Sequence, residues 1–133
     1  MRIGIPAETR PGETRVAATP ETVKKLAASH QVLVESGAGL RAAAPDAAYE
    51  AAGATVVDAA SAFDADLVLK VRTPDAVELA RMRRGAALVG MLDPFDTENL
   101  ALLAAAGVHA FALEAAPRIT RAQSLDVLSS QAN

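Results

Sequence analysis

The chain has no cysteine and very few aromatic residues. Without cysteine it can form neither a disulfide framework nor a thiolate metal site, which fits a reducing cytoplasm. Aromatic side chains make up only 3% of the 133 residues, so the core has to be built from Ala, Val, Leu and Ile. Such residues suit helices packed closely on a parallel sheet, and the composition therefore favours the α/β class.

An excess of positive charge is also missing, and so is a long apolar run. With 13 basic and 16 acidic residues the net charge is -3, so we expect no nucleic-acid partner. The longest apolar run, residues 100–108, is far shorter than the ~20 residues of a membrane span, and the N-terminus lacks a signal peptide's apolar region. We expect a soluble, cytoplasmic chain. Its one basic cluster, "RMRR" before Gly85, is interpreted as the last turn of a helix.

Strand-like apolar runs alternate with helical patterns along the whole chain. The predicted strands are residues 2–6, 31–36, 54–58, 65–71, 86–92 and 108–113, and the predicted helices are residues 19–29, 45–53, 73–85 and 96–107. Strands joined through helices run parallel, because each connection is a crossover. We therefore predict a doubly wound, mostly parallel α/β sheet of about six strands with helices on both faces, a Rossmann-like or flavodoxin-like lobe. The lobe is expected to span residues 1–120.

In such sheets ligands gather at the carboxyl ends of the strands. The long connection after the first strand alternates Glu8 and Glu13 with Arg10 and Arg15. Solvated ion pairs are the favoured interpretation for Arg10, whereas a site role for Arg15 stays open because an apolar run follows it. Lys70 ends an otherwise apolar strand, where an ammonium group indicates either an exposed edge or a site.

Phosphate and metal motifs are weak in this chain. The "SGAG" turn at residues 36–39 could cradle a phosphate, but it is not G-x-G-x-x-G, and a simple turn is the favoured interpretation. No complete G-x-G-x-x-G occurs anywhere in the sequence. Because no second histidine stands at metal spacing and cysteine is absent, we predict no metal site.

The last residues, "PRITRAQSLDVLSSQAN", have a polar helical pattern. Thr120 and Gln123 have capping-box spacing, which gives Gln123 a purely structural explanation. Arg118 and Arg121, however, lie at the positive end of the predicted helix, where cations are unfavourable unless an anion is near. Residues 121–133 are expected to begin a helix that leads beyond the lobe.

Helical spacing separates two stripes on this segment. One stripe contains Ala122, Leu125 and Leu128, and the other contains Gln123, Asp126 and Ser130 with Ser129 at its edge. A face of amide, carboxylate and hydroxyl groups can both donate to and accept from one ligand amide. A nicotinamide carboxamide is such a group.

These stretches resemble the N-terminal lobe of the alpha subunit, the NAD(H)-binding component, of proton-translocating NAD(P) transhydrogenase. The resemblance rests on "MRIGIPAETRPGETRVAATP", "VESGAG" and "LVLKV", which alanine dehydrogenases share, and above all on the final "PRITRAQSLDVLSSQAN". It implies direct hydride transfer from NAD(H) to NADP(H), with the NADP held by a partner component. It also implies that a second, G-x-G-x-x-G lobe of the same subunit follows residue 133.

The resemblance also implies residue roles and partners. In that family the residues matching Arg118, Gln123, Asp126 and Ser129 lie around the nicotinamide ring of NAD, and Gln123 and Asp126 are the candidate catalytic residues. Arg15 and Lys70 are possible further cleft residues. The implied partners are the membrane and NADP-binding components, with a homodimer of the full subunit at the cytoplasmic face of the inner membrane. The isolated 133 residues are expected to be inactive.

Two alternatives stay open. An alanine-dehydrogenase-type lobe is the first, because that family uses a lysine and an arginine that match Lys70 and Arg15. Its histidine has no counterpart, since "LDPF" at residues 92–95 stands at that place. The second alternative is a stand-alone α/β binding module whose terminal segment docks a partner.

Overall fold

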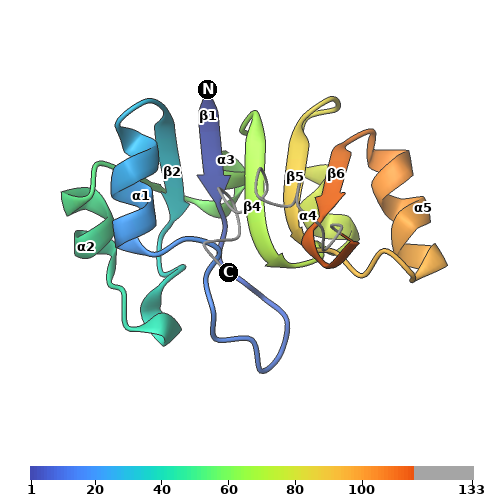
Figure 1. Ribbon diagram of the computed structural model, residues 1–133, viewed down its shortest axis with the longest axis horizontal. Helices are drawn as coiled ribbons and strands as arrows, with labels where there is room; N and C mark the ends of the chain where they lie inside the picture. The colour runs from blue at the N-terminus through green and yellow to red at the C-terminus, as the bar shows by residue number, and fades with distance from the viewer. Residues whose placement is uncertain (116–133) are drawn as a thin grey trace, which may run out of the picture.

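Six short apolar segments form one parallel sheet in the computed structural model, which describes residues 1–115 (Figure 1). The strands are β1 (Arg2–Ile5), β2 (Gln31–Glu35), β3 (Thr55–Val57), β4 (Leu67–Arg72), β5 (Ala87–Met91) and β6 (His109–Ala112). Their order is β3-β2-β1-β4-β5-β6, and every neighbouring pair is parallel. The predicted α/β class is confirmed.

Helices connect the strands and begin and end at residues suited to those places. They are α1 (Pro20–Ala27), α2 (Asp46–Ala51), α3 (Ala59–Phe63), α4 (Ala76–Ala80) and α5 (Thr97–Ala106), with short 3-10 turns η1 (Leu40–Ala42) and η2 (Leu113–Ala115). The Thr19 side chain accepts from the Thr22 backbone N–H, so Thr19 is the N-cap of α1 as predicted. Gly107 ends α5 at a φ of 71°, a left-handed conformation that glycine adopts without strain.

Two helical predictions were wrong. Helix α3 was not predicted, because a single five-residue turn is too short to show helical periodicity. Helix α4 ends at Ala80, so the arginines at 81, 83 and 84 do not form its last turn. Arg83 is instead held by Asp64 and Asp66 at 3.0 Å each, and Arg84 donates to the carbonyl of residue 105 at the end of α5.

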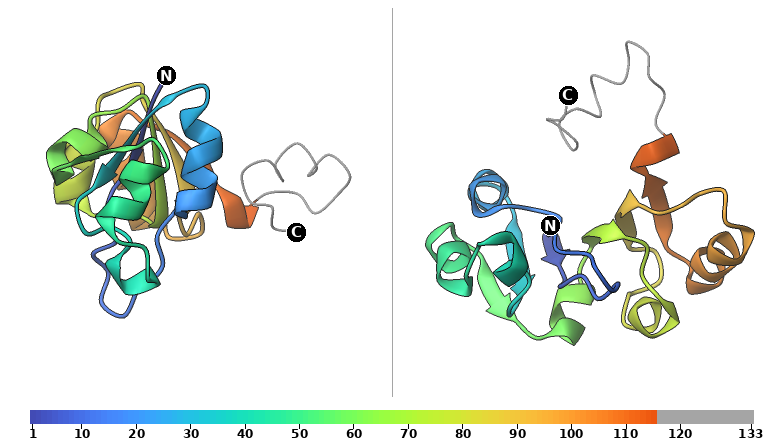
Figure 2. Two further views of the ribbon diagram at one scale, coloured as in Figure 1. Left: turned by 90° about the vertical axis from the view of Figure 1, so that its left-hand side faces the viewer. Right: turned by 90° about the horizontal axis from the view of Figure 1, so that it is seen from below.

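The helices bury the two faces of the sheet unequally (Figure 2). One face, the α1 face, packs over β1 and β2 against α1 and α2, with a buried cluster around Val23, Val34 and Tyr49. The Tyr49 hydroxyl donates to the Ala18 carbonyl at 2.7 Å. On the opposite α4 face, α4 and α5 pack on β4 and β5 around Leu88, and α3 packs against β1 and β2. The β1–β2 half of the sheet is therefore covered on both faces.

This strand order places a topological switch point between β1 and β4. The connections from β1 and from β4 leave in opposite directions along the sheet, so their carboxyl ends open a crevice where ligands bind in such folds. A ligand site is therefore expected among the loops after β1, β4 and β5. Within residues 1–115, no helix is both long and apolar enough to cross a membrane.

The approach of β1 to α3 requires glycine at position 4. A Cβ at Gly4 would collide with the backbone carbonyl of Ala62, so we expect Gly4→Ala to lower the free energy of unfolding by about 3 kcal/mol or more. The control is Gly12→Ala, where φ is 83° but nothing lies near an added Cβ, and about 1–2 kcal/mol is expected. Urea denaturation measures both. Equal losses for the two variants would contradict close packing of β1 on α3.

Candidate functional site

The loop between β1 and α1 folds back over the carboxyl ends of the strands through Glu8. Its carboxylate accepts hydrogen bonds from the backbone N–H groups of Val71 (2.8 Å) and Arg72 (3.0 Å) at the end of β4. Strand β1 ends at Ile5 and offers β4 no further ladder partner there. The Glu8 side chain therefore takes the place of a strand at this point.

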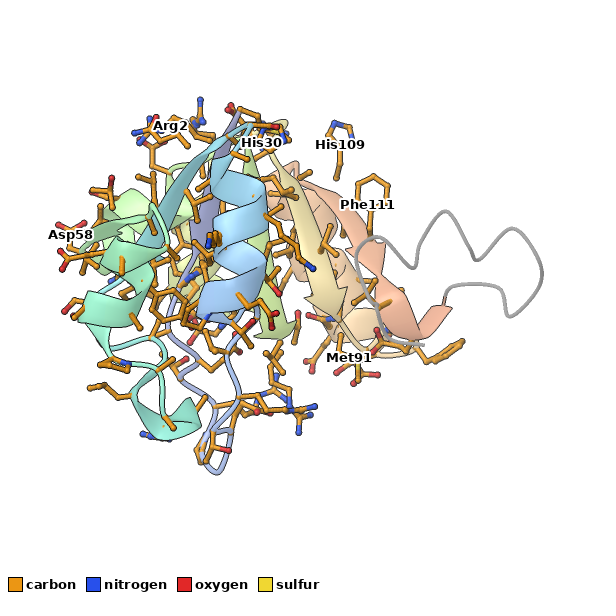
Figure 3. The ribbon with its side chains drawn as sticks, turned by 60° about the vertical axis from the view of Figure 1, so that its left-hand side comes forward. Arg2, His30, Asp58, Met91, His109 and Phe111 are labelled. Carbon is orange, nitrogen blue, oxygen red and sulfur yellow. The ribbon has the colours of Figure 1, made fainter. Side chains whose placement is uncertain are left out.

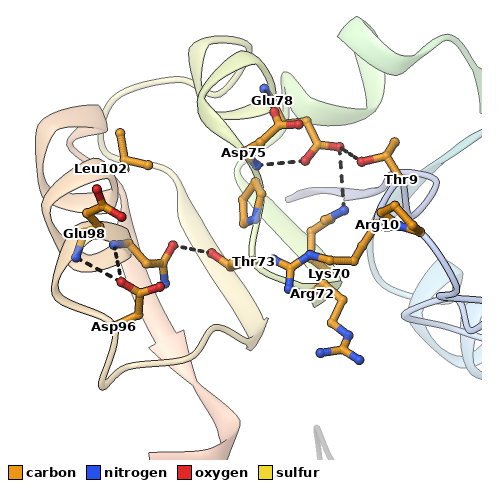
Figure 4. Close-up of a pocket in the computed structure, with 13 residues that line it drawn as sticks. Thr9, Arg10, Lys70, Arg72, Thr73, Asp75, Glu78, Asp96, Glu98 and Leu102 are labelled. Atoms are coloured by element: carbon orange, nitrogen blue, oxygen red, sulfur yellow. Dashed lines mark hydrogen bonds and ion pairs between the residues drawn. The ribbon is translucent and has the colours of Figure 1, made fainter.

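Glu8 also belongs to a buried ionic cluster in which Lys70 contacts both Glu8 and Glu78. Figure 4 shows the contact between Lys70 and Glu78. The Lys70 Nζ atom lies 3.1 Å from a Glu8 oxygen and 3.7 Å from a Glu78 oxygen. The side chains of Lys70 and Glu8 are 1% and 2% exposed. Thr9 donates its hydroxyl proton to Glu78 at 3.2 Å. The cluster thus joins the first loop, β4 and α4, and its cation is already neutralised.

A second carboxylate of the same loop, Glu13, organises two arginines. Arg15 donates two guanidinium hydrogen bonds to Glu13 at 2.9 Å, and the Nε of Arg72 donates a third at 2.9 Å. These hydrogen bonds, first from Arg15 and then from Arg72, hold the pKa of the Glu13 carboxyl well below its usual range. The Arg15 and Arg72 side chains remain 58% and 45% exposed, so both guanidinium groups also face solvent.

A polar pocket of about 340 Å³ opens beside the cluster (Figure 4). Its walls come from loop residues 9–11, the end of β4 with the following turn, and the first turns of α4 and α5. On the α5 side Asn99 is buried, accepts from the Thr73 hydroxyl at 2.8 Å and donates to the Leu92 carbonyl. The pocket carries both signs of charge, which suits a polar ligand. No cluster of metal-ligating side chains occurs within residues 1–115.

The two cleft residues predicted from sequence occupy different environments. Lys70 is buried and paired rather than at an exposed edge, whereas Arg15 is exposed and held by Glu13. Lys70 pairs with Glu8 and Arg15 pairs with Glu13, and both glutamates belong to the loop after β1. The other predicted site residues, Arg118, Gln123, Asp126 and Ser129, lie outside the described residues.

Glu8, Glu13 and Glu78 are the residues that the sequence interpretation missed. The sequence favours solvated ion pairs around Arg10 and predicts no role for Glu8 and Glu13, whereas both carboxylates are buried in the structure. Glu78 stands three residues after Asp75, and the two side chains form a capping box at the start of α4. That spacing was a readable signal for the helix start. No local pattern indicated that the other Glu78 oxygen contacts Lys70.

The glycine turn at residues 36–39 is structural, as favoured from the sequence. The Gly37 N–H donates to Asp46 at 2.8 Å, and the Ser36 hydroxyl donates to the same carboxylate at 2.8 Å. These two hydrogen bonds lower the pKa of Asp46. A phosphate would have to displace an ionised side chain of the protein itself to use this N–H group.

Lys70→Met should destabilise the chain strongly. The change leaves Glu8 and Glu78 buried without their cation, so a loss of about 3–5 kcal/mol in the free energy of unfolding is expected. Lys24→Met, at an exposed position of α1, is the matched control. Adding Glu8→Gln to Lys70→Met should recover part of the loss in urea denaturation. A Lys70→Met chain as stable as the control would show that the cluster does not hold the loop.

Glu13 should make stability depend on pH. Because its pKa is lower in the folded chain than in the unfolded chain, its stabilisation is complete above the ordinary carboxyl pKa of about 4.3 and is lost as the pH falls below it. The free energy of unfolding should therefore fall less between about pH 5 and pH 3 in Glu13→Gln than in the unchanged protein. Identical slopes for the two proteins would refute this account.

The chain is similar to proteins of one family over almost its whole length. The family model "Alanine dehydrogenase/PNT, N-terminal domain" matches residues 4–133. The NAD(P) transhydrogenase subunit alpha of Cereibacter sphaeroides is 43% identical over all of this chain and 26% of its own length. The alanine dehydrogenase of Mycobacterium tuberculosis is 47% identical over 69% of this chain.

The fold agrees with these sequence comparisons. The crystal structure of a transhydrogenase from Sinorhizobium meliloti superposes with a TM-score of 0.89 at 49% identity, covering 98% of this chain and 40% of that one. The chain thus spans about a quarter to two fifths of the length of these relatives. The family model matches residues 4–133, and the identity of 43% extends over the whole of this chain. The chain therefore belongs to the alanine dehydrogenase/PNT N-terminal domain family.

Proposed function

We propose that this chain is the first lobe of the NAD(H)-binding component of a proton-translocating NAD(P) transhydrogenase. The observation that carries the proposal is how much of this chain each kind of relative matches. Transhydrogenase alpha subunits match 100% of the chain, its last residues included, at 42–44% identity. The alanine dehydrogenases of M. tuberculosis and Bacillus subtilis match 69% and 86% of it. The lobe would supply one wall of a nicotinamide site and be inactive alone.

The proposed reaction is direct hydride transfer between NAD(H) and NADP(H). Such a transfer needs the reacting carbons about 3–3.5 Å apart and needs no proton at the ring, so the protein supplies position and electrostatics. Lys70, the one buried amine at the pocket, is already paired with two carboxylates. Because its ammonium group is paired with these carboxylates, a structural role suits Lys70 better than that of a general acid or base.

NAD fits this lobe at its nicotinamide end. At the carboxyl ends of β2 and β4 the backbone N–H groups of Gly37, Val71 and Arg72 already donate to the protein's own carboxylates. An anionic pyrophosphate would compete with those carboxylates, which supports a phosphate grip outside residues 1–115. When bound, NADH would supply the hydride.

The residues that would meet the nicotinamide follow η2 in the chain. In this proposal Arg118, Gln123, Asp126 and Ser129 contact the ring and its carboxamide, and Gln123 also orients the NADP(H) of the partner component. The further partners are a G-x-G-x-x-G lobe of the same subunit, the membrane component and a second copy of the full subunit. The assembly would stand at the cytoplasmic face of the inner membrane.

Alanine dehydrogenase is the second candidate, since the residues matching its lysine and arginine are present as Lys70 and Arg15. Against it, Lys70 is closed off by Glu8 and Glu78, and the stretch where the family's histidine is expected, residues 92–95, contains none. Asp93 has a φ of 52°, and its N–H is held by Glu114 at 2.8 Å. Pyruvate-dependent oxidation of NADH by the full-length subunit would favour this candidate.

The decisive variant is Gln123→Ala in the full-length subunit reconstituted with its NADP-binding partner. If Gln123 orients the two nicotinamides, the rate of hydride transfer should fall tenfold or more, since ~1.4 kcal/mol of lost positioning is a factor of ten. NADH affinity should change little, because the phosphates are held elsewhere. Stopped-flow absorbance measures the rate, and equilibrium titration measures the affinity.

Two results separate this role from helix capping. A cap alone predicts a loss of about 0.5–2 kcal/mol in the free energy of unfolding with an unchanged transfer rate. The control variant is Gln31→Ala, which should keep the normal rate. Gln31 is exposed at the amino end of β2, whereas the pocket lies at the carboxyl ends of the strands. A Gln123→Ala subunit that transfers hydride normally but melts earlier would overturn the proposed role of Gln123.

A further inference from the structure

Two loops project beyond the carboxyl ends of the strands and contact each other. One is the loop after β1, and the other follows β2 and contains η1 (Figure 1). Both extend past the sheet at the edge opposite to the one where Arg2 and His30 lie (Figure 3). The Arg41 side chain on η1 donates to the backbone carbonyl of Glu13 at 3.3 Å, which joins the two loops. Together they form a raised wall beside the crevice.

Four exposed arginine side chains lie on this wall and at its base. Arg10 and Arg15 belong to the first loop, Arg41 belongs to η1 and Arg72 to the end of β4. We call these four side chains the arginine rim. Glu13 pairs with Arg15 and Arg72, whereas Arg10 and Arg41 form no ion pair within residues 1–115. The rim therefore keeps an excess of positive charge.

The arginine rim has the opposite sign of charge to the rest of the chain. The whole sequence has 13 basic and 16 acidic residues and a net charge of -3. Without the four arginines of the rim, nine basic residues remain against 16 acidic ones, which is a net charge of -7. Such a separation of charge orients an approaching protein and speeds its association when the surface of that protein is negative. The carboxyl-end edge is therefore suited to meet an acidic surface.

Glu13 holds two arginines of the rim in fixed positions. Its Oε1 atom accepts from the guanidinium groups of both Arg15 and Arg72, each at 2.9 Å, so two like charges lie side by side. These hydrogen bonds hold the pKa of the Glu13 carboxyl well below its usual range, which keeps Glu13 ionised at neutral pH. A guanidinium group that is already oriented loses little side-chain entropy when it pairs with a carboxylate. This part of the rim is therefore organised before any partner binds.

The extent of the rim favours a protein over a small ligand. Arg10 and Arg72 line the polar pocket, but Arg15 and Arg41 lie outside its walls (Figure 4). A single small anion in the pocket would leave those two arginines without a counter-charge, whereas a protein surface can place a carboxylate against each. Arginine is also enriched in protein interfaces and among the residues that contribute most to their affinity.

We propose that the arginine rim is a docking surface for an acidic protein surface, and that the partner is the NADP(H)-binding component. The identity of the partner rests on the proposed function, which needs the two nicotinamides about 3–3.5 Å apart. A partner that brings its nicotinamide so close to the crevice has to cover the carboxyl-end edge, where the rim lies. Carboxylates of the partner pair with the rim and fix its orientation over the crevice.

Association kinetics with the NADP(H)-binding component test the docking surface. In the full-length subunit, Arg41→Glu should lower the association rate constant about tenfold at low salt, and that constant should then fall less steeply as salt is added. The matched control is Lys25→Glu, which makes the same change of charge at an exposed position in the last turn of α1. Its rate constant should stay within about twofold of that of the unchanged subunit. Surface plasmon resonance measures all three.

The outcomes separate this inference from the proposed function. If the unchanged subunit binds the component but Arg41→Glu associates as fast as Lys25→Glu, the docking surface is wrong and the proposed function is unaffected. If the unchanged subunit forms no complex with the component, both are wrong. If Arg41→Glu slows the binding of NADH and leaves docking of the component unchanged, the rim serves the dinucleotide and the inference is overturned.

Glu13→Gln separates the orientation of the rim from its charge. The change makes the rim more positive, so association should not slow, but Arg15 and Arg72 lose the charge that orients them. The dissociation rate constant of the complex should therefore rise several-fold, in a subunit whose circular dichroism is that of the unchanged protein. Thr14→Ala, at the exposed neighbouring position, should leave it unchanged. Equal dissociation of both variants would show that Glu13 does not position the rim for docking.

Discussion

The arrangement of the carboxyl-end edge depends on one buried ammonium group. Lys70 is 1% exposed, and a cation so deeply buried persists only when opposite charges are in contact with it. Glu8 provides one charge from the loop after β1, and Glu78 provides the other from α4. The long first loop is therefore fixed over the strand ends rather than free in solvent. The polar pocket lies beside this cluster, between the loop, the end of β4 and the first turns of α4 and α5.

Acidic side chains satisfy the backbone donors at this edge. Glu8 caps the end of β4, Asp46 caps the turn after β2 and Glu114 caps the end of β5. In nucleotide-binding sheets such donors commonly hold phosphate. Here the donors are occupied by the protein's own anions. That distribution suits the proposed function, in which this lobe would contact the nicotinamide end of a dinucleotide through side chains while another part holds the phosphates.

Much of the fold could be predicted because its signals are local. Apolar runs mark the strands, Thr19 with Pro20 marks the start of α1, and Gly107 marks the end of α5. The site could be predicted only in part. Lys70 was identified as unusual, but its partner Glu8 lies far away in sequence, and a carboxylate between arginines is more often solvated than buried. Helix α3 was missed because five residues carry no period. Arg83 was placed wrongly because α4 ends at Ala80, and its contacts with Asp64 and Asp66 come from a distant part of the sequence that no local pattern reveals.

The unequal covering of the sheet links its packing to the proposed chemistry. The order β3-β2-β1-β4-β5-β6 sends the first two crossovers over one face and the later ones over the other. The loop after β1 and the turn after β4 therefore meet at the strand ends where the two sets of crossovers part. Glu8 reaches that place from the loop and Lys70 from β4, and the polar pocket opens beside their ion pair. The change of face between the crossovers is thus what brings charged side chains of both halves of the chain to one edge of the sheet, which is the edge where the proposed chemistry needs a ligand to lie.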